Sequence, residues 1–195
     1  MPLNIVQSPD GRRQRSERSQ TAIIEAALAL MDEGVLVPTA QQIADRAGVG
    51  IRSFFRHFED MDSLFSAADA MLLDSYEALF SATDRSGAID ERVLRTAELF
   101  GHAYDQLRQV ILSTQAQLWR SATLRQRYDR HQRRLCAELE KWLPELTRLS
   151  QQNREAAHAI ASFDMWYRLR GQQELSRKVS IEIVAGMLTH LINAG

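Results

Sequence analysis

The stretch that decides the fold is residues 39–65, TAQQIADRAGVGIRSFFRHFEDMDSLF. Thr39 stands at a helix N-cap position and Gln42 follows three residues later, which is the spacing of a capping box. Gly48 falls where a tight turn needs a positive φ, a conformation that glycine adopts without steric cost. The sequence therefore predicts two helices joined by a short turn.

The second helix of this pair has an apolar face and a polar, cationic face. Its apolar residues recur at helical spacing and are Ile51, Phe54, Phe55 and Phe58. Arg52 and Arg56 are four residues apart and therefore share another face. A short, cationic helix after a tight turn is typical of the helix-turn-helix motif, whose second helix fits the DNA major groove.

The same stretch resembles the TetR-type family of bacterial transcriptional regulators. The residues that match the family signature are Thr39, Ile43, Ala44, Ala47, Gly48, Val49, Ser53, Phe54, His57, Phe58 and Leu64. The departures are Gly50 for a capping serine, Phe55 for a tyrosine that offers its hydroxyl to a phosphate, and Met61 for a lysine that touches the DNA backbone. The resemblance implies an all-α protein of about nine helices, with a three-helix helix-turn-helix domain followed by a larger helical domain for ligand binding and dimerisation.

Composition narrows the remaining possibilities. The formal net charge of the 195 residues is −1, so DNA binding must come from a local patch. The single cysteine, Cys136, excludes an internal disulfide and a cysteine metal cluster, and no run of about 18 apolar residues predicts a membrane span. No nucleophile elbow, glycine-rich phosphate loop or HExxH motif occurs. We therefore expect a cytoplasmic protein that is not an enzyme and holds no cofactor or metal.

The order of signals along the chain predicts three regions. Residues 1–15 contain two prolines, Gly11 and three arginines, and are expected to form a flexible basic arm. Residues 16–60 are expected to form the helix-turn-helix domain, and residues 61–195 the ligand-binding and dimerisation domain. Beyond residue 80, apolar periodicity predicts helices at about 89–107, 109–119, 123–142, 153–170 and 174–192, and no strand signals occur.

The residues expected to contact DNA fall into three sets. The base-contacting set is Ile51, Arg52, Ser53 and Arg56, because arginine reads guanine in the major groove and the start of the recognition helix concentrates base contacts. By resemblance to the family, the phosphate-contacting set is Thr39, Gln41, Phe55 and His57. The arm set is Arg12, Arg13, Arg15 and Arg18, since arginine arms can enter a minor groove. The alternatives are phosphate contact without base selection for Arg56 and a solvated terminus for the arm.

A second basic run spans residues 120–134. Its arginines are Arg120, Arg125, Arg127, Arg130, Arg133 and Arg134. Apolar residues at helical spacing run opposite to them, so we interpret the segment as an amphipathic helix with a solvated cationic face, in preference to a nucleic-acid stripe.

Two further sites are expected in the C-terminal region. Large aromatics with a few polar groups suit a small-molecule pocket, and the expected lining is Phe100, His102, Tyr104, Trp119, Tyr128, His131 and Trp142. The same residues would equally suit a packed helical core. The apolar residues between Val179 and Ile192 exceed the single stripe that covers one domain's core. A homodimer is therefore expected through Ala156, Ile160, Phe163, Tyr167, Ile183, Met187 and Leu191. The alternative is that these residues are buried inside one subunit.

Taken with the resemblance, these sites predict a transcriptional regulator, expected to be a repressor. It would bind a palindromic operator in double-stranded DNA as a homodimer, and a small-molecule effector, apolar or aromatic, would release it. Two alternatives from other classes stay open. One is a ligand-binding protein or enzyme built on a helical bundle, and the other is an interaction module whose helix-turn-helix no longer binds DNA.

Overall fold

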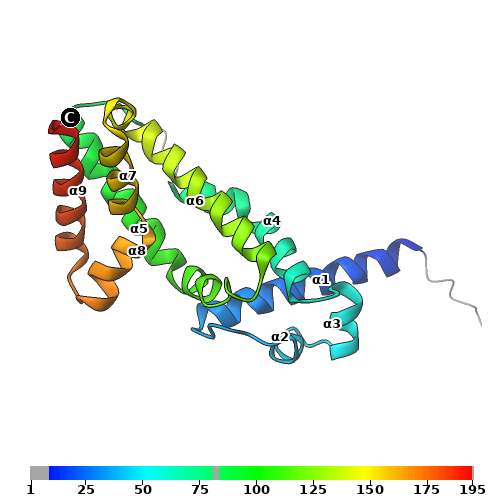
Figure 1. Cartoon of the computed structure of the whole chain (residues 1–195). Coiled ribbons are helices and arrows are strands. Elements are labelled where there is room, and N and C mark those ends of the chain that lie inside the picture. The colour runs from blue at the N-terminus through cyan, green and yellow to red at the C-terminus, as the bar shows by residue number, and fades with distance from the viewer. Residues whose placement is uncertain (1–8, 81–83, 195) are drawn as a thin grey trace, which may run out of the picture. The chain divides into compact units, whose positions relative to one another are not determined.

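The described part of the chain, residues 9–80 and 84–194 of a computed structural model, is helical and contains no strand (Figure 1). The all-α prediction is therefore confirmed. The helices are α1 (Pro9–Asp32), α2 (Ala40–Arg46), α3 (Ile51–His57), α4 (Met61–Phe80), α5 (Ile89–Gln115), α6 (Ala122–Trp142), the 3-10 helix η1 (Pro144–Arg148), α7 (Gln151–Ile160), α8 (Phe163–Tyr167), the π-helix η2 (Arg168–Gln172) and α9 (Arg177–Asn193). No helix among these residues is long and apolar enough to cross a membrane.

The chain divides into two compact units. The first combines the residues up to Leu72 with 109–125, and the second combines 73–108 with the residues from Gln126 onward. This division differs from the boundaries at residues 16–60 and 61–195 that the sequence suggests. The reason is that α4, α5 and α6 each contribute residues to both units.

The first unit is built around one hydrophobic core contributed by α1, α2, α3 and the start of α4. Its buried members are Ile23, Ile24, Ala26, Ala27, Ile43, Ala44, Phe54, Phe58, Leu64 and Ala68. Ile43 and Phe54 are completely inaccessible to solvent, so the apolar stripes of α2 and α3 are the surfaces that hold the two helices together. This packing fixes which side chains of α3 point outward.

The turn between α2 and α3 follows the local signals in the sequence. Thr39 accepts a hydrogen bond from the backbone N–H of Gln42 at 3.2 Å, and the Gln42 Oε1 accepts from the Thr39 N–H at 2.9 Å. Gly48 has a φ of +68°, which is the left-handed conformation expected for it. The capping box and the turn glycine are therefore both confirmed.

The N-terminal arm is corrected by the structure. Helix α1 begins at Pro9, so residues 9–15 are helical and the expectation of a flexible arm is wrong for them, while residues 1–8 lie outside the described part. Proline suits the first turn of a helix because its missing N–H would have no partner there. An i,i+4 ion pair between Arg13 and Glu17, at 2.9 Å, adds support one turn later.

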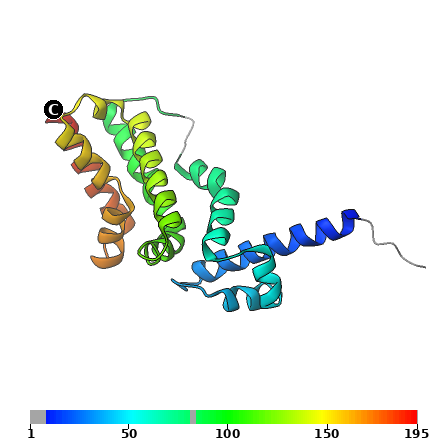
Figure 2. The ribbon, with the colours of Figure 1, turned by 45° about the vertical axis from the view of Figure 1, so that its right-hand side comes forward.

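The second unit contains α7, α8 and α9 and the second-unit parts of α4, α5 and α6 (Figure 2). Edge-to-face aromatic contacts run through its core, with Phe80 against Phe100 at 5.1 Å between ring centroids and against Tyr104 at 5.4 Å. Tyr104 continues to Phe163 at 5.7 Å. α7 and α9 contact one another and lie side by side in both views. These aromatics therefore form a continuous packed core.

Two of the expected helices have different limits in the structure. The segments expected at 89–107 and 109–119 form the single helix α5, which ends at Gln115 and is followed by a turn over 116–120. The helix expected at 153–170 is interrupted after Ile160, because Ser162 caps a new helix by accepting from the Met165 N–H at 3.3 Å. Serine is one of the residues that favour an N-cap over a helix interior.

Candidate functional site

The recognition helix α3 presents arginines outward from a buried aromatic base. Phe54 and Phe58 fill the core, while Arg52 and Arg56 are exposed. Arg56 Nη2 donates to Ser53 Oγ at 2.7 Å, which holds its guanidinium along the helix. Arg52 makes no hydrogen bond or ion pair with any residue that the structure describes. Its five donors therefore face solvent without a competing partner among the described residues.

Phe55 adds an apolar surface beside these arginines. Its side chain is 52% exposed and meets Phe54 edge to face at 5.2 Å between centroids. A phenyl ring cannot donate to a phosphate as the family's tyrosine does. The ring can still pack against deoxyribose or a thymine methyl, which are the apolar surfaces of a DNA groove.

Two of the polar side chains expected to reach phosphates are engaged within the protein. The Thr39 hydroxyl serves the capping box, and Gln41 Nε2 donates to Asp45 Oδ1 at 2.7 Å. Arg46, which could have joined them, forms an ion pair with Glu33. That hydrogen bond from Arg46 holds the pKa of Glu33 below its ordinary value. Each of these side chains would have to give up its hydrogen bond or ion pair within the protein in order to bind a phosphate.

His57 closes the recognition helix in a partly buried position. Its Nε2 is shielded from solvent and has no hydrogen-bond partner in the part of the chain described. Burial, with a smaller contribution from the charge of Arg56, lowers the pKa of His57 below its ordinary value. The ring is therefore neutral near pH 7, and any contact with a phosphate would have to use Nδ1.

The four arm arginines lie on α1, not on an extended arm. Arg13 pairs with Glu17, and Arg15 and Arg18 are exposed. Arg12 lies in the same helix, and its side chain is outside the described part. A helix is too wide to enter a minor groove as an extended arm does, so these cations are placed to meet a phosphate backbone instead.

Comparison with known proteins agrees with this geometry. Residues 23–68, which contain the turn and α3, match the family model of bacterial regulatory proteins, tetR family. Residues 23–68 therefore form a DNA-binding domain of the tetR family. Proteins of this family are DNA-binding regulators and are generally not enzymes.

Two solved structures share the fold of this chain. SCO7518 of Streptomyces coelicolor A3(2), a candidate transcriptional regulator, is 23% identical with a TM-score of 0.58, over 88% of this chain and 99% of that chain. The transcriptional regulator RHA1_ro04179 of Rhodococcus sp. Rha1 is 14% identical with a TM-score of 0.67, over 92% of this chain and 96% of that chain. No curated protein sequence matches this chain. At these identities the likeness establishes the fold alone.

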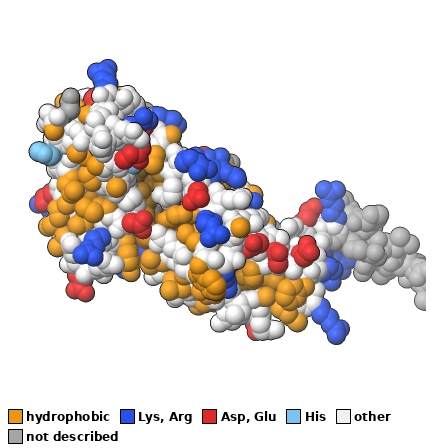
Figure 3. All heavy atoms as spheres, in the orientation of Figure 1, with side chains coloured by type: hydrophobic (Ala, Val, Ile, Leu, Met, Phe, Trp, Pro, Cys, Tyr) orange, Lys and Arg blue, Asp and Glu red, His pale blue; other side chains and the backbone are white. Residues whose placement is uncertain are grey.

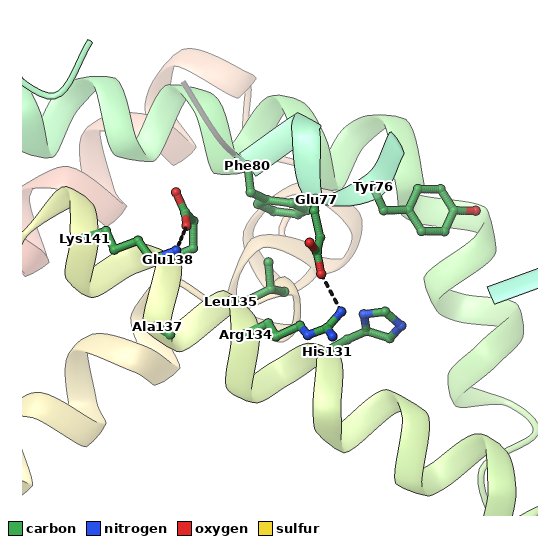
Figure 4. A pocket seen from close by; sticks show the side chains of 9 residues that line it. All are labelled: Tyr76, Glu77, Phe80, His131, Arg134, Leu135, Ala137, Glu138 and Lys141. Carbon is green, nitrogen blue, oxygen red and sulfur yellow. Dashed lines mark hydrogen bonds and ion pairs between the residues drawn. The ribbon is translucent and has the colours of Figure 1, made fainter. Parts of the chain in front are cut away.

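The second unit of the chain contains a cavity of about 330 Å³ (Figure 4). It lies between the end of α4 and the C-terminal part of α6, and its lining is Tyr76, Glu77, Phe80, His131, Arg134, Leu135, Ala137, Glu138 and Lys141. Of the residues expected to line a ligand pocket, only His131 is among them. The charged members were missed because they look like ordinary helix-surface residues in the sequence.

The other expected pocket residues are placed differently. Phe100, Tyr104 and Trp142 are buried at 4%, 3% and 2% exposure, so they belong to the packed core that was the alternative interpretation. Trp119 is 79% exposed in the first unit, because the chain leaves the helix before it, and its expected inward orientation is wrong. His102 is exposed and bonds Gln106 one turn away at 3.0 Å.

The expected dimer residues divide into two groups. Ile160 and Phe163 are 9% and 3% exposed within one chain, so packing inside the subunit leaves little of them for a partner. Met187 is 40% exposed, and Ala156, Tyr167, Ile183 and Leu191 are partly buried. Figure 3 shows hydrophobic atoms exposed over the region of α7 to α9. This surface keeps apolar area that one subunit does not cover.

The basic run on α6 contributes in part to internal contacts. Arg134 pairs with Glu77, and Arg125 Nη1 donates to the Leu118 carbonyl at 3.0 Å. Arg130 and Arg133 are exposed, and Lys and Arg side chains gather over this helix in Figure 3. The interpretation of α6 as an amphipathic helix fits this arrangement, since Leu139 and Trp142 are buried on its other face.

Proposed function

We propose that this regulator is a repressor that binds a palindromic operator as a homodimer and is released by a small molecule bound in its second unit. The observation that carries the DNA-binding part is the outward position of Arg52, which has no partner in the described chain and stands one residue into a recognition helix. Side chains at this end of the helix reach base edges, and arginine pairs bidentately with guanine.

The homodimer is supported by the apolar surface of α9. Val179 and Met187 are 39% and 40% exposed, on a helix that ends the chain beside α7. A two-fold dimer buries the same surface from both copies and gives two recognition helices related by symmetry. Such a pair reads two half-sites in a palindrome, about one helical turn apart.

The DNA-binding proposal is tested by selecting bound sequences from random double-stranded DNA. The wild-type protein should enrich a palindrome. Arg52→Ala should lose discrimination at one base pair of each half-site, with a cost of about 1–3 kcal/mol at that position. Arg133→Ala, an exposed arginine of α6, is the matched control and should enrich the same palindrome as the wild type.

The remaining DNA-contact residues give a second measurement. His57→Ala should weaken binding to all sequences about equally, because a phosphate contact carries no base information. If no sequence is enriched by the wild-type protein, the alternative of a helix-turn-helix without DNA binding is favoured. An unchanged operator preference in Arg52→Ala would remove this residue from base readout.

A further inference from the structure

The cavity between α4 and α6 has an apolar middle. Phe80 is only 4% exposed and is held by its edge-to-face contact with Phe100. Leu135 of α6 points toward Phe80 from the opposite side in Figure 4. A volume of about 330 Å³ is at the small end of the range for small-molecule sites. The middle of the cavity therefore suits a compact apolar or aromatic group.

At one end of the cavity, a buried carboxylate is already neutralised. Glu138 is 9% exposed, and Lys141 Nζ donates to its Oε2 at 2.9 Å. Arg85 pairs with the other oxygen, and its guanidinium lies over the Trp142 ring at 5.5 Å. Because both oxygens already have a cationic partner, the charge of this carboxylate is balanced within the protein, and this end offers little attraction to a positively charged ligand.

The other end of the cavity has an exchangeable cation. Arg134 pairs with Glu77 across the gap between α6 and α4, and the two side chains are 46% and 48% exposed (Figure 4). An ion pair with this much exposure contributes little net free energy, because water screens it. A ligand carboxylate can therefore replace Glu77 and accept two parallel hydrogen bonds from the guanidinium. His131 lies one turn before Arg134 on the same face of α6.

The exchange at Arg134 favours an anionic ligand. The charged residues of the lining are Arg134, Lys141, Glu77 and Glu138, and Arg85 pairs with Glu138 from outside the lining. When Glu77 leaves Arg134, the guanidinium loses its carboxylate partner, which a ligand carboxylate replaces and a neutral ligand does not.

We propose that this cavity binds an aromatic carboxylate, with the ring between Phe80 and Leu135 and the carboxylate on Arg134 in place of Glu77. This names the chemical class of the effector and rests on the proposed function only for its effect on DNA binding. Binding itself is measured without DNA.

The experiment uses 2-naphthoate as the probe, titrated into the full-length protein by calorimetry at pH 7. The ligand controls are neutral 2-naphthamide, which has the same planar shape, and cationic 2-naphthylmethylamine, which has the same ring system. We expect 2-naphthoate to bind at least about tenfold more tightly than either control. This is the factor expected when a ligand lacks the charge-assisted hydrogen bond that a carboxylate forms with a guanidinium. Equal affinities for the acid and the amide would overturn the proposal.

Protein variants test the partner of the carboxylate. Arg134→Gln should lose most of the preference for 2-naphthoate over 2-naphthamide, whereas Arg133→Gln, the exposed neighbour outside the cavity lining, should keep it. Glu77→Gln should bind 2-naphthoate more tightly than the wild type, because it removes the competing carboxylate. A loss of affinity in a Glu77→Gln variant that unfolds at the wild-type temperature, or an unchanged preference in Arg134→Gln, would overturn the proposal.

Operator binding is then measured with and without saturating 2-naphthoate. If the protein prefers 2-naphthoate and the variants change this preference as expected, but the operator affinity does not change, the proposed ligand class is supported. Release of the operator by this ligand is then refuted. If 2-naphthoate does not bind while the operator is bound normally, the ligand class fails and the DNA-binding function stands.

Discussion

The Ser113 hydroxyl of α5 donates to the backbone carbonyl of Leu36, 77 positions earlier in the chain, at 2.7 Å. Gln117 Nε2 donates to the same carbonyl at 3.3 Å. Ser113 and Gln117 are 0% and 1% exposed, so two buried donors converge on one acceptor in the connection between α1 and α2. This contact explains why residues 109–125 belong to the first unit and help to position the start of the helix-turn-helix.

Removing this contact should loosen the connection between α1 and α2. We expect Ser113→Ala to lower the free energy of unfolding by about 0.5–1.5 kcal/mol, the net contribution of a typical hydrogen bond. Limited proteolysis should cut near Leu36 and Val37 faster than in the wild type, since both are already more than 40% exposed. Thr114→Ala is the control, because the Thr114 hydroxyl bonds the Val110 carbonyl inside the same helix. Equal proteolysis of the two variants would contradict this role.

The helix-turn-helix could be predicted from the sequence because its signals are local. A capping box needs only Thr39 and Gln42, and a turn needs only a glycine such as Gly48 at the right place. The start of α1 at Pro9 could not be predicted in this way, because two prolines and Gly11 among three arginines favour a flexible arm, although arginine is a good helix former.

The cavity could not be predicted in the same way because it depends on tertiary packing. Glu77 of α4 and Arg134 of α6 are 57 positions apart in the sequence. Nothing in the sequence around either residue indicates that the other lies beside it. Aromatic residues such as Tyr104 were easier to notice, but a helical core needs them as much as a ligand does. Trp119 was misplaced because helical periodicity was extended through a turn.

The turn between α2 and α3 makes a paired prediction for two glycines. Gly48→Ala should lower the free energy of unfolding by about 1–2 kcal/mol, because a side chain disfavours its φ of +68°. Gly50→Ser should raise it by a few tenths of a kcal/mol, because Gly50 is the N-cap of α3, has a φ of −69° and provides no side-chain cap. An added Cβ meets nothing within 4 Å at either position, so the backbone conformation decides both signs. Chemical denaturation of the two variants checks this, and a stabilising Gly48→Ala would contradict it.

The contact between α6 and α7 predicts a dependence of stability on pH. Arg154 holds the Glu140 carboxylate through Nε at 2.6 Å and Nη2 at 2.7 Å, and His158 Nε2 lies 2.9 Å from it. The hydrogen bond from Arg154 is the main reason that the pKa of Glu140 lies below its ordinary value. A carboxylate with a lowered folded-state pKa stabilises the protein above its unfolded pKa, and that contribution is lost as the pH falls through the folded pKa.

We therefore expect Glu140→Gln to cost about 1–3 kcal/mol at pH 7.5, the range for a hydrogen bond to a charged group, and much less near pH 3.5. Thermal unfolding of variant and wild type at the two pH values measures the difference. Glu155→Gln is the matched control, since the Glu155 side chain is 67% exposed and lies 3.7 Å from His158. Its effect should be small at both pH values, and a cost for Glu140→Gln that did not shrink in acid would contradict the assignment.

The last prediction concerns the exposed apolar surface of α9. Met187→Glu places a charge on a side chain that is 40% exposed in one chain and would be covered in the proposed homodimer. An unpaired carboxylate has a much higher free energy when it is buried in an interface than when water surrounds it. The association equilibrium should therefore shift toward the monomer.

Leu94→Glu is the matched control, because Leu94 of α5 is 43% exposed and lies outside the expected interface. Sedimentation at micromolar concentration should report a dimer for the wild type and for Leu94→Glu, and a monomer for Met187→Glu. Because each monomer has one recognition helix, Met187→Glu should also lose most of its affinity for a two-half-site operator. A dimer that persists in Met187→Glu would show that α9 does not form the interface at this residue.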